Sequence, residues 1–206
     1  MKIDRLQYIT QGNSEEAILA EVQAVLNAGV NWVQLRIKDD QLDRMKIALK
    51  VKVLCAGKAT FIINDKVAIA QELNADGVHL GLDDMPILEA RKILGIEKII
   101  GGTANTLEDC KERMESGADY IGLGPFRTTT TKKKLSPILG LEGYRHITPK
   151  TNGKITIPVV AIGGIELDDI KMLKSETGLY GIAVSGLIAK ASDKEALVNE
   201  IYKNLE

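Results

Sequence analysis

Short apolar segments alternate with longer amphipathic segments along the whole chain, and this alternation is the feature that most restricts the fold. The apolar segments are rich in β-branched residues, as expected of buried strands. They lie at Leu6–Ile9, Trp32–Leu35, Thr60–Ile63, Gly77–Leu80, Lys98–Ile100, Tyr120–Leu123, Pro158–Ile162 and Gly181–Val184. The segments between them carry apolar residues three and four positions apart, which predicts helices. These helices are expected at Glu16–Leu26, Leu42–Leu54, Val67–Leu73, Pro86–Leu94, Leu107–Met114, Leu167–Leu173 and Lys194–Leu205.

Eight strand–helix units predict an α/β fold in which eight parallel strands close into a (β/α)8 TIM barrel. No linker rich in Pro, Ser and Gly divides the chain, so we expect a single domain that covers residues 1–206. The alternative is an open doubly wound sheet, which predicts a GxGxxG turn after the first strand. Thr10-Gln11-Gly12-Asn13 stand in that place instead, and the barrel is therefore favoured.

The overall charge excludes some partners. A net charge of −1 gives no general positive field, so we expect neither nucleic acid nor a membrane surface as a partner. No apolar run approaches 18 residues, and neither Cys55 nor Cys110 belongs to a CxxC motif. These features predict a cytoplasmic protein with reduced thiols. The sequence is compatible with a homodimer but does not indicate the oligomeric state.

Hydroxyl and ammonium groups are concentrated directly after the sixth predicted strand. Four threonines, Thr128–Thr131, are followed by three lysines, Lys132–Lys134. Hydroxyls donate hydrogen bonds to anions and ammonium groups neutralise phosphate charge, so the run is typical of an anion site. Taken alone, such a run is more often a solvated basic loop, and the other strand ends reverse that preference.

The second predicted strand leads into further polar residues. A period of two places Gln34, Arg36 and Lys38 on one face, and in a barrel that face points inward at the mouth. Such a row is costly to bury without a partner, which favours a bound anion. The alternative is that Arg36 is a structural arginine held in a salt bridge.

Carboxylates follow the next two predicted strands. Asn64 and Asp65 end the third strand, and Asp83 and Asp84 follow the fourth. Mg²⁺ is usually held by one or two carboxylates together with substrate phosphates, so carboxylates among basic residues predict a Mg²⁺ site. Helix capping is the competing explanation, because Asp is a favoured N-cap residue.

Small residues end the last two predicted strands, at Gly163-Gly164 and at Ser185-Gly186. Paired glycines let the backbone approach a phosphate, and the loops after strands seven and eight are a frequent phosphate site in such barrels. Together with the pyrophosphate-like site made by Arg36, Lys38, Asn64, Lys132 and the aspartates, this predicts two phosphorylated substrates, one of which loses pyrophosphate.

Several motifs in this order resemble thiamine phosphate synthase, and the resemblance covers essentially the whole chain. The matching segments are VQLRIK at 33–38, IIND at 62–65, ADGVHLGLDDMP at 75–86, GADYIGLGPFRTTTTK at 117–132, IPVVAIGGI at 157–165 and GIAVSGLI at 181–188. The family joins hydroxymethylpyrimidine pyrophosphate to thiazole phosphate with the help of Mg²⁺. The resemblance therefore implies a transferase of thiamine biosynthesis that binds phosphorylated small molecules.

The resemblance also implies roles for individual residues. Lys132, Arg36 and Thr103 would act at the reacting centre, where Lys132 bridges towards the departing pyrophosphate. The pyrophosphate side would be bound by Gln34, Arg36, Lys38 and Asn64, the Mg²⁺ by Asp65 and Asp84, and the thiazole phosphate by Thr129, Thr131, Gly164 and Ser185. Thr103 would lie against the pyrimidine and the pyrophosphate.

Two departures from the family pattern bear on substrate contacts. Asn105 stands where the family often has His, and Leu82 stands where it often has Gln. One competing function is the related thiazole tautomerase, which needs a proton-transferring residue that Asn105 does not supply. The other is a non-catalytic barrel that binds thiamine precursors, which would be expected to lose the metal or lysine positions.

Overall fold

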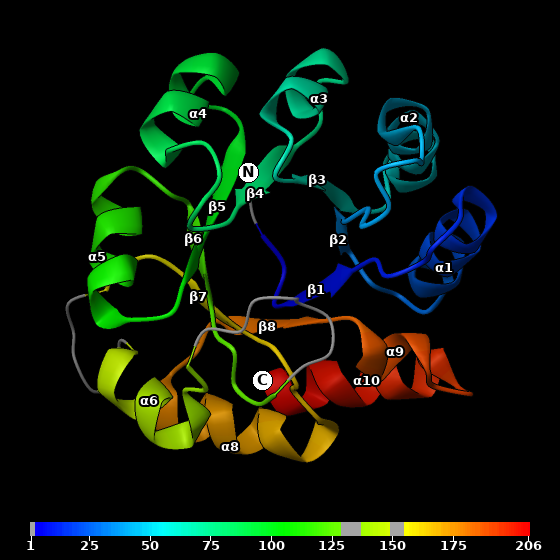
Figure 1. The fold of residues 1–206 in the computed structure, drawn as a ribbon. Coiled ribbons are helices and arrows are strands. Elements are labelled where there is room, and N and C mark those ends of the chain that lie inside the picture. Colours follow the sequence, from blue (N-terminus) through cyan, green and yellow to red (C-terminus); the bar gives the residue numbers. More distant parts are fainter. Residues whose placement is uncertain (1–2, 129–136, 149–154) are drawn as a thin grey trace.

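The fold is a closed barrel of eight parallel strands paired in sequence order, from β1 round to β8 and back to β1 (Figure 1). A computed structural model describes residues 3–128, 137–148 and 155–206. The strands are β1 Leu6–Ile9, β2 Trp32–Leu35, β3 Thr60–Asn64, β4 Gly77–Leu80, β5 Ile99–Ala104, β6 Tyr120–Leu123, β7 Val159–Ile162 and β8 Gly181–Val184. The predicted TIM barrel is confirmed, with every predicted strand present.

Helices surround the barrel (Figure 1). They are α1 Glu15–Asn27, α2 Arg44–Cys55, α3 Val67–Glu72, α4 Ile87–Leu94, α5 Leu107–Glu115, α6 Gly140–Ile147, α8 Leu167–Thr177, α9 Gly186–Ala189 and α10 Lys194–Leu205. The amphipathic spacing predicted seven of these to within a few residues but gave no bounds for α6 or α9. Both α6 and α9 begin at a glycine, which is a poor helix former, and α9 is only one turn long.

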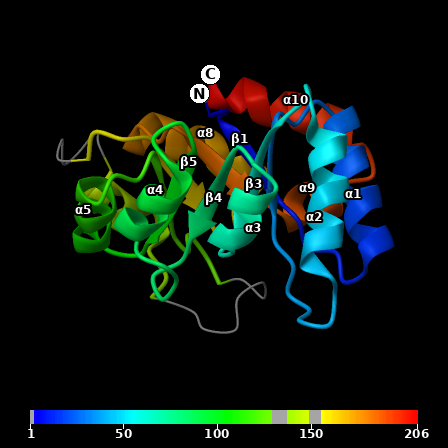
Figure 2. The ribbon, with the colours of Figure 1, turned by 90° about the horizontal axis from the view of Figure 1, so that it is seen from above.

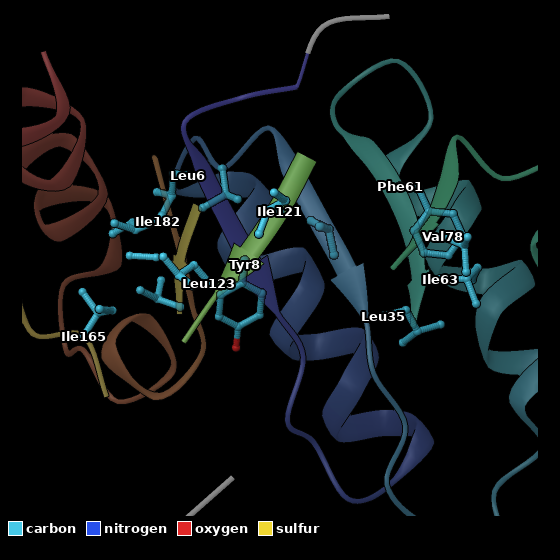
Figure 3. Close-up of a cluster of buried hydrophobic side chains, with 14 of the residues drawn as sticks. Leu6, Tyr8, Leu35, Phe61, Ile63, Val78, Ile121, Leu123, Ile165 and Ile182 are labelled. Carbon is cyan, nitrogen blue, oxygen red and sulfur yellow. The ribbon is translucent and has the colours of Figure 1, made fainter. Parts of the chain in front are cut away.

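The apolar core has two layers, because alternate strand residues point to opposite faces of the barrel wall. Outward residues such as Leu6, Tyr8 and Ile121 pack under the helices in the larger cluster (Figure 3). Inward residues such as Trp32, Ile62 and Tyr120 form a smaller cluster inside the barrel. The interior therefore contains a packed floor, and the polar residues collect above it.

Side-chain caps set where several helices begin. Ser14, Asp43, Thr106 and Asp193 each accept a hydrogen bond from the backbone amide three residues later, at 2.9–3.1 Å. A cap of this kind stabilises a helix by about 1 kcal/mol. The caps fix the start of α1, α2, α5 and α10.

Both chain ends lie at the same end of the barrel in Figure 2. Arg5, directly before β1, donates a hydrogen bond to the carbonyl of Leu205 at 2.7 Å, which ties this end together. The opposite end, where the strands finish, carries the polar loops. Among the helices described, none combines the length and the apolar character that crossing a membrane requires.

Candidate active site

A pocket of about 380 Å³, called the mouth pocket below, lies at the carboxyl ends of β2 and β3. Residues of α2 and α3 line it together with the segments that follow the two strands. Its lining includes Arg36, Lys38, Asn64 and Asp65, four of the residues predicted for the pyrophosphate and metal site. They meet because Leu35 of β2 lies beside Ile63 of β3 in the parallel register, so the two strands finish at the same level. The structure thus brings cations, an amide and a carboxylate into one pocket.

Arg36 and Lys38 are cations that have lost part of their water. Arg36 is partly buried, and burial lowers the pKa of its guanidinium, although the charge of Asp65 opposes this. Lys38 is more exposed, and its pKa is lowered first by burial and then by the charge of Arg36. Two neighbouring cations that are partly desolvated are stabilised by a bound anion, so this geometry suits a multiply charged ligand.

The carboxyls of Asp65 and Asp84 lie next to each other. Burial, and after it the hydrogen bond and charge of Asp84, raise the pKa of Asp65 to about 6, although Arg36 and Lys66 oppose the shift. Asp84 is held in place by the backbone amide of Gly81, which donates to its Oδ2 at 2.7 Å. Two carboxyls this close cannot both ionise easily without a cation between them.

Neither carboxylate is a helix cap. Lys66 occupies the N-cap position of α3 and Pro86 that of α4, and neither helix start has a side-chain cap. Asp83 is exposed, whereas Asp84 is partly buried against Gly81. Across residues 3–128, 137–148 and 155–206 there is no group of three or more His, Cys, Asp and Glu side chains that could hold a metal ion. The pair fits a Mg²⁺ ion that takes its other ligands from water and substrate phosphate.

Gln34 and Thr103 lie deeper than the pocket, inside the barrel. Gln34 is 2% exposed, and its amide nitrogen donates to the side-chain oxygen of Gln7 at 3.1 Å. Thr103 is 8% exposed, and its hydroxyl lies 3.1 Å from Nε2 of His79. Gln34 therefore does not share the pocket of Arg36 and Lys38, because those two residues follow the end of β2 and Gln34 lies within the strand.

The glycine pair after β7 makes a turn that only glycine fits. Gly163 and Gly164 have φ angles of 90° and 70°, in the left-handed region. A Cβ on Gly163 would lie 2.8 Å from Cβ of Pro125, and a Cβ on Gly164 would lie 2.8 Å from Cβ of Arg127. The turn thus packs directly against the segment that leads into the threonine run.

Ser185, after β8, holds a buried hydroxyl oxygen that has no hydrogen-bond partner in the described part of the chain. An unsatisfied buried hydroxyl is costly, and a bound anion would relieve that cost by accepting its hydrogen bond. Ser185 directly precedes α9. The arrangement is consistent with the predicted phosphate site.

Arg127 and Asp169 join the two halves of this second site, and the sequence analysis did not identify either. Both guanidinium NH groups of Arg127 donate to the carboxylate of Asp169, one of them at 2.6 Å, and the Arg127 side chain also reaches the carbonyl of Gly164 at 3.2 Å. The backbone amide of Arg127 donates to the carbonyl of Gly163 at 2.9 Å. Asp169 also accepts from the amide of Glu166 at 2.8 Å. The only available signal was an acidic residue in the first turn of a predicted helix.

Three predicted residues, Thr129, Thr131 and Lys132, lie outside the described residues. Of the two departures from the family pattern, Leu82 is exposed at 42%, and Asn105 is buried with its amide nitrogen donating to the carbonyl of Gly124. Asn105 thus contributes a hydrogen bond that steadies the chain after β6, which matches its inability to act as an acid or base.

A family model described as thiamine monophosphate synthase matches residues 6–188 of this chain. A thiamine-phosphate synthase of Flavobacterium johnsoniae is 52% identical over 205 residues, which cover 98% of this chain and 96% of that relative. A thiamine-phosphate synthase of Phocaeicola vulgatus is 49% identical over 97% of both chains.

Solved structures agree with the sequence relatives. A thiamine phosphate pyrophosphorylase from Pyrococcus furiosus superposes with a TM-score of 0.82 at 34% identity, covering 98% of this chain and 95% of that one. A 3-hexulose-6-phosphate synthase, at 17% identity and a TM-score of 0.74, shares the fold alone. The chain therefore belongs to the thiamine monophosphate synthase family.

Proposed function

We propose that this protein joins 4-amino-2-methyl-5-hydroxymethylpyrimidine pyrophosphate to thiazole phosphate, giving thiamine phosphate and pyrophosphate. The observation that carries the proposal is the mouth pocket, in which Arg36 and Lys38 lie beside Asn64 and Asp65 in a chain of this family. A pocket with clustered cations and the Asp65 carboxyl, which is hydrogen-bonded to Asp84, suits a pyrophosphate bound together with a divalent cation.

The difficult step is the departure of pyrophosphate, because negative charge develops on the leaving oxygen. Arg36 and Lys38 offer positive charge that is already partly desolvated, so it stabilises that oxygen more strongly than an exposed side chain would. We assign Lys132 to the same task on the strength of the family motif. The electron-rich aminopyrimidine stabilises the positive charge left on its methylene carbon, so no protein nucleophile is needed.

We propose Mg²⁺ as the cofactor, held by Asp65 and Asp84. The raised pKa of Asp65 reflects burial and the neighbouring Asp84 carboxyl, and a divalent cation would remove the repulsion between them. When bound, Mg²⁺ would neutralise charge on the pyrophosphate. Asn64 would complete this side of the pocket through its amide.

The second half of the site would hold the thiazole phosphate. The family resemblance assigns Gly164 to this phosphate, and the hydroxyl of Ser185 has no partner within the described residues. Thr129 and Thr131 would add hydroxyl donors. Holding both substrates at one barrel mouth lets the thiazole nitrogen attack the methylene carbon in a fixed orientation, which is the main gain that positioning gives.

We place this activity in the cytoplasm. Cys55 and Cys110 are both free thiols and both buried, so they have no role as a disulfide framework.

The experiment is incubation of the purified protein with both phosphorylated precursors and Mg²⁺, with thiamine phosphate detected after oxidation to its fluorescent derivative. Product that requires both precursors, and that a chelator abolishes, supports the synthase and its cofactor. A change in the thiazole phosphate alone would indicate a tautomerase instead. Tight precursor binding without any product would indicate a non-catalytic barrel.

A further inference from the structure

Polar side chains from five strands form one continuous hydrogen-bonded chain through the barrel interior. Gln34 on β2 donates to Gln7 on β1 at 3.1 Å, and Gln7 donates to the hydroxyl of Tyr120 on β6 at 3.1 Å. The same hydroxyl lies 3.0 Å from Nδ1 of His79 on β4, whose Nε2 lies 3.1 Å from the hydroxyl of Thr103 on β5. The two ends of this chain are residues that the family resemblance assigns to substrate binding.

The absence of a side chain at Gly101 makes this chain possible. Gly101 pairs with His79 on one side and with Tyr120 on the other, so it lies between them on β5. A Cβ on Gly101 would come within 2.2 Å of Cζ of Tyr120 and 2.5 Å of Nδ1 of His79. Any other residue there would drive the two rings apart, so the contact between Tyr120 and His79 requires glycine at this position.

The orientation of the two glutamine amides gives this hydrogen-bonded chain one favoured direction. The oxygen of Tyr120 already accepts from Gln7, and its single proton is therefore available for Nδ1 of His79. Burial raises the pKa of Tyr120, so this proton is retained. In this direction a neutral His79 accepts at Nδ1 and donates from Nε2 to the hydroxyl of Thr103, which lies 3.1 Å away. The Thr103 hydroxyl keeps its own proton for another partner.

We propose that Tyr120 and His79 are positioning residues that decide which hydrogen bonds Gln34 and Thr103 offer to the pyrimidine substrate. With its amide nitrogen directed to Gln7, Gln34 presents its carbonyl oxygen as an acceptor. Thr103, which accepts from His79, presents its hydroxyl as a donor. The barrel interior thereby defines one acceptor and one donor beneath the mouth pocket.

This inference rests on the proposed function and deepens it, because the pair suits an aminopyrimidine that carries a pyrophosphate. An exocyclic amino group can donate to the oxygen of Gln34, and a ring nitrogen or a pyrophosphate oxygen can accept from Thr103. A pyrimidine with a carbonyl in place of the amino group would face the Gln34 oxygen with a second acceptor. The hydrogen-bonded chain would therefore select against such a pyrimidine.

The tautomer of His79, which reports the direction of the hydrogen bonds, can be measured in the ligand-free protein by nitrogen-15 NMR of labelled histidine. The chain has two histidines, and His146 is exposed on α6 and serves as the internal comparison. We expect His79 to be neutral with its proton on Nε2. A Tyr120→Phe variant should lose this single form and show a mixture. Protonation of wild-type His79 on Nδ1 would overturn the proposed direction.

Kinetics test whether the direction matters for the substrate. Tyr120→Phe should raise KM for the pyrimidine pyrophosphate roughly tenfold, about the effect of one hydrogen bond, and leave KM for thiazole phosphate unchanged. Tyr144→Phe is the matched control, because Tyr144 is equally buried but bonds to the carbonyl of Leu123 outside the barrel interior. Equal changes in both KM values, or none, would overturn the positioning role.

Failure of the proposed function is a separate result. It would appear as wild-type protein that makes no thiamine phosphate, whereas the histidine spectrum of that same sample still reports the tautomer. A calorimetric titration of the pyrimidine pyrophosphate into wild type and Tyr120→Phe then replaces the kinetic comparison. Equal affinity in that titration would overturn the inference.

Discussion

Replacing Asp65 with Asn should stabilise the metal-free protein and abolish its response to Mg²⁺. Asp65 has a φ of 62°, and Asn tolerates this left-handed conformation well, so the backbone should not change. The substitution removes a carboxyl whose pKa is raised to about 6 by burial and by the hydrogen bond and charge of Asp84 together. A group with a raised carboxyl pKa is costly to ionise in the folded state, and Asn avoids that cost.

The size and sign of the effect follow from this pKa. A rise from 3.8 to about 6 corresponds to at most about 3 kcal/mol. Because the carboxyl is partly open to water, screening reduces this to about 1–2 kcal/mol. Below about pH 4 Asp65 is protonated in both folded and unfolded chains, so the substitution gives no gain there. Between pH 4 and 6 the unfolded chain loses its proton first, and the full gain is present only above about pH 6.

Thermal unfolding followed by circular dichroism measures this gain. In chelator at pH of about 7.5, Asp65→Asn should unfold roughly 3–6 °C above wild type, and near pH 4 the two should coincide. Added Mg²⁺ should raise the midpoint of wild type only. Asp83→Asn is the control, because Asp83 is exposed on the same loop as Asp84. A variant less stable than wild type at neutral pH, or equally stabilised at pH 4, would refute the reasoning.

Three further predictions concern the second half of the site and the lysine of the motif. Asp169→Asn should destabilise the fold by about 2 kcal/mol, because Asp169 accepts hydrogen bonds from Arg127 and from the amide of Glu166. It should also raise KM for thiazole phosphate. Chemical unfolding and steady-state kinetics check this, and an unchanged KM would argue that the Arg127–Asp169 pair does not support the phosphate site. Ser185→Ala should leave the free energy of unfolding within about 0.5 kcal/mol of wild type. It should weaken thiazole phosphate binding in calorimetry, and equal affinity of the variant and wild type would contradict a phosphate role for Ser185. Lys132→Ala should lower kcat by about 100-fold or more with an unchanged circular dichroism spectrum, and an unchanged kcat would remove Lys132 from the mechanism.

The barrel could be predicted because each strand carries its own signal. Segments such as Trp32–Leu35 and Gly77–Leu80 were located without error, since a short buried β-branched run bounded by polar residues has few other structures available. The α6 and α9 helices could not be delimited in the same way. Gly140 and Gly186 begin them, and their formation depends on packing against the barrel rather than on local preference.

The candidate site was predictable where residues follow strand ends, and not where contacts cross the barrel. Arg36, Asn64 and Asp65 share a pocket because neighbouring parallel strands finish at one edge, which strand positions alone reveal. The bond from Gln7 to Tyr120 joins residues 113 positions apart. Gln7 in the first strand was a visible signal, as a polar residue between apolar neighbours, but its partner depends on register and on the space left by Gly101.

The distinction between a metal site and helix caps also needed coordinates. Asp65 lies two residues before the start of α3 and Asp84 three residues before the start of α4, close to the positions where capping is the ordinary role of Asp. The positive φ of Asp65 turns it away from the cap position, and Asp84 bonds instead to the amide of Gly81. Local backbone conformation, which a single sequence does not specify, excludes the cap role, and the metal site remains a proposal.

The central claim is that the protein forms thiamine phosphate by displacing pyrophosphate from the pyrimidine precursor, and phosphorus-31 NMR of a single reaction tests it directly. With both precursors and Mg²⁺ present, the account predicts that thiamine phosphate and free pyrophosphate appear together in equal amounts, and that neither appears when one precursor is omitted. Pyrophosphate released without thiamine phosphate, or no pyrophosphate at all from active and folded protein, would contradict it.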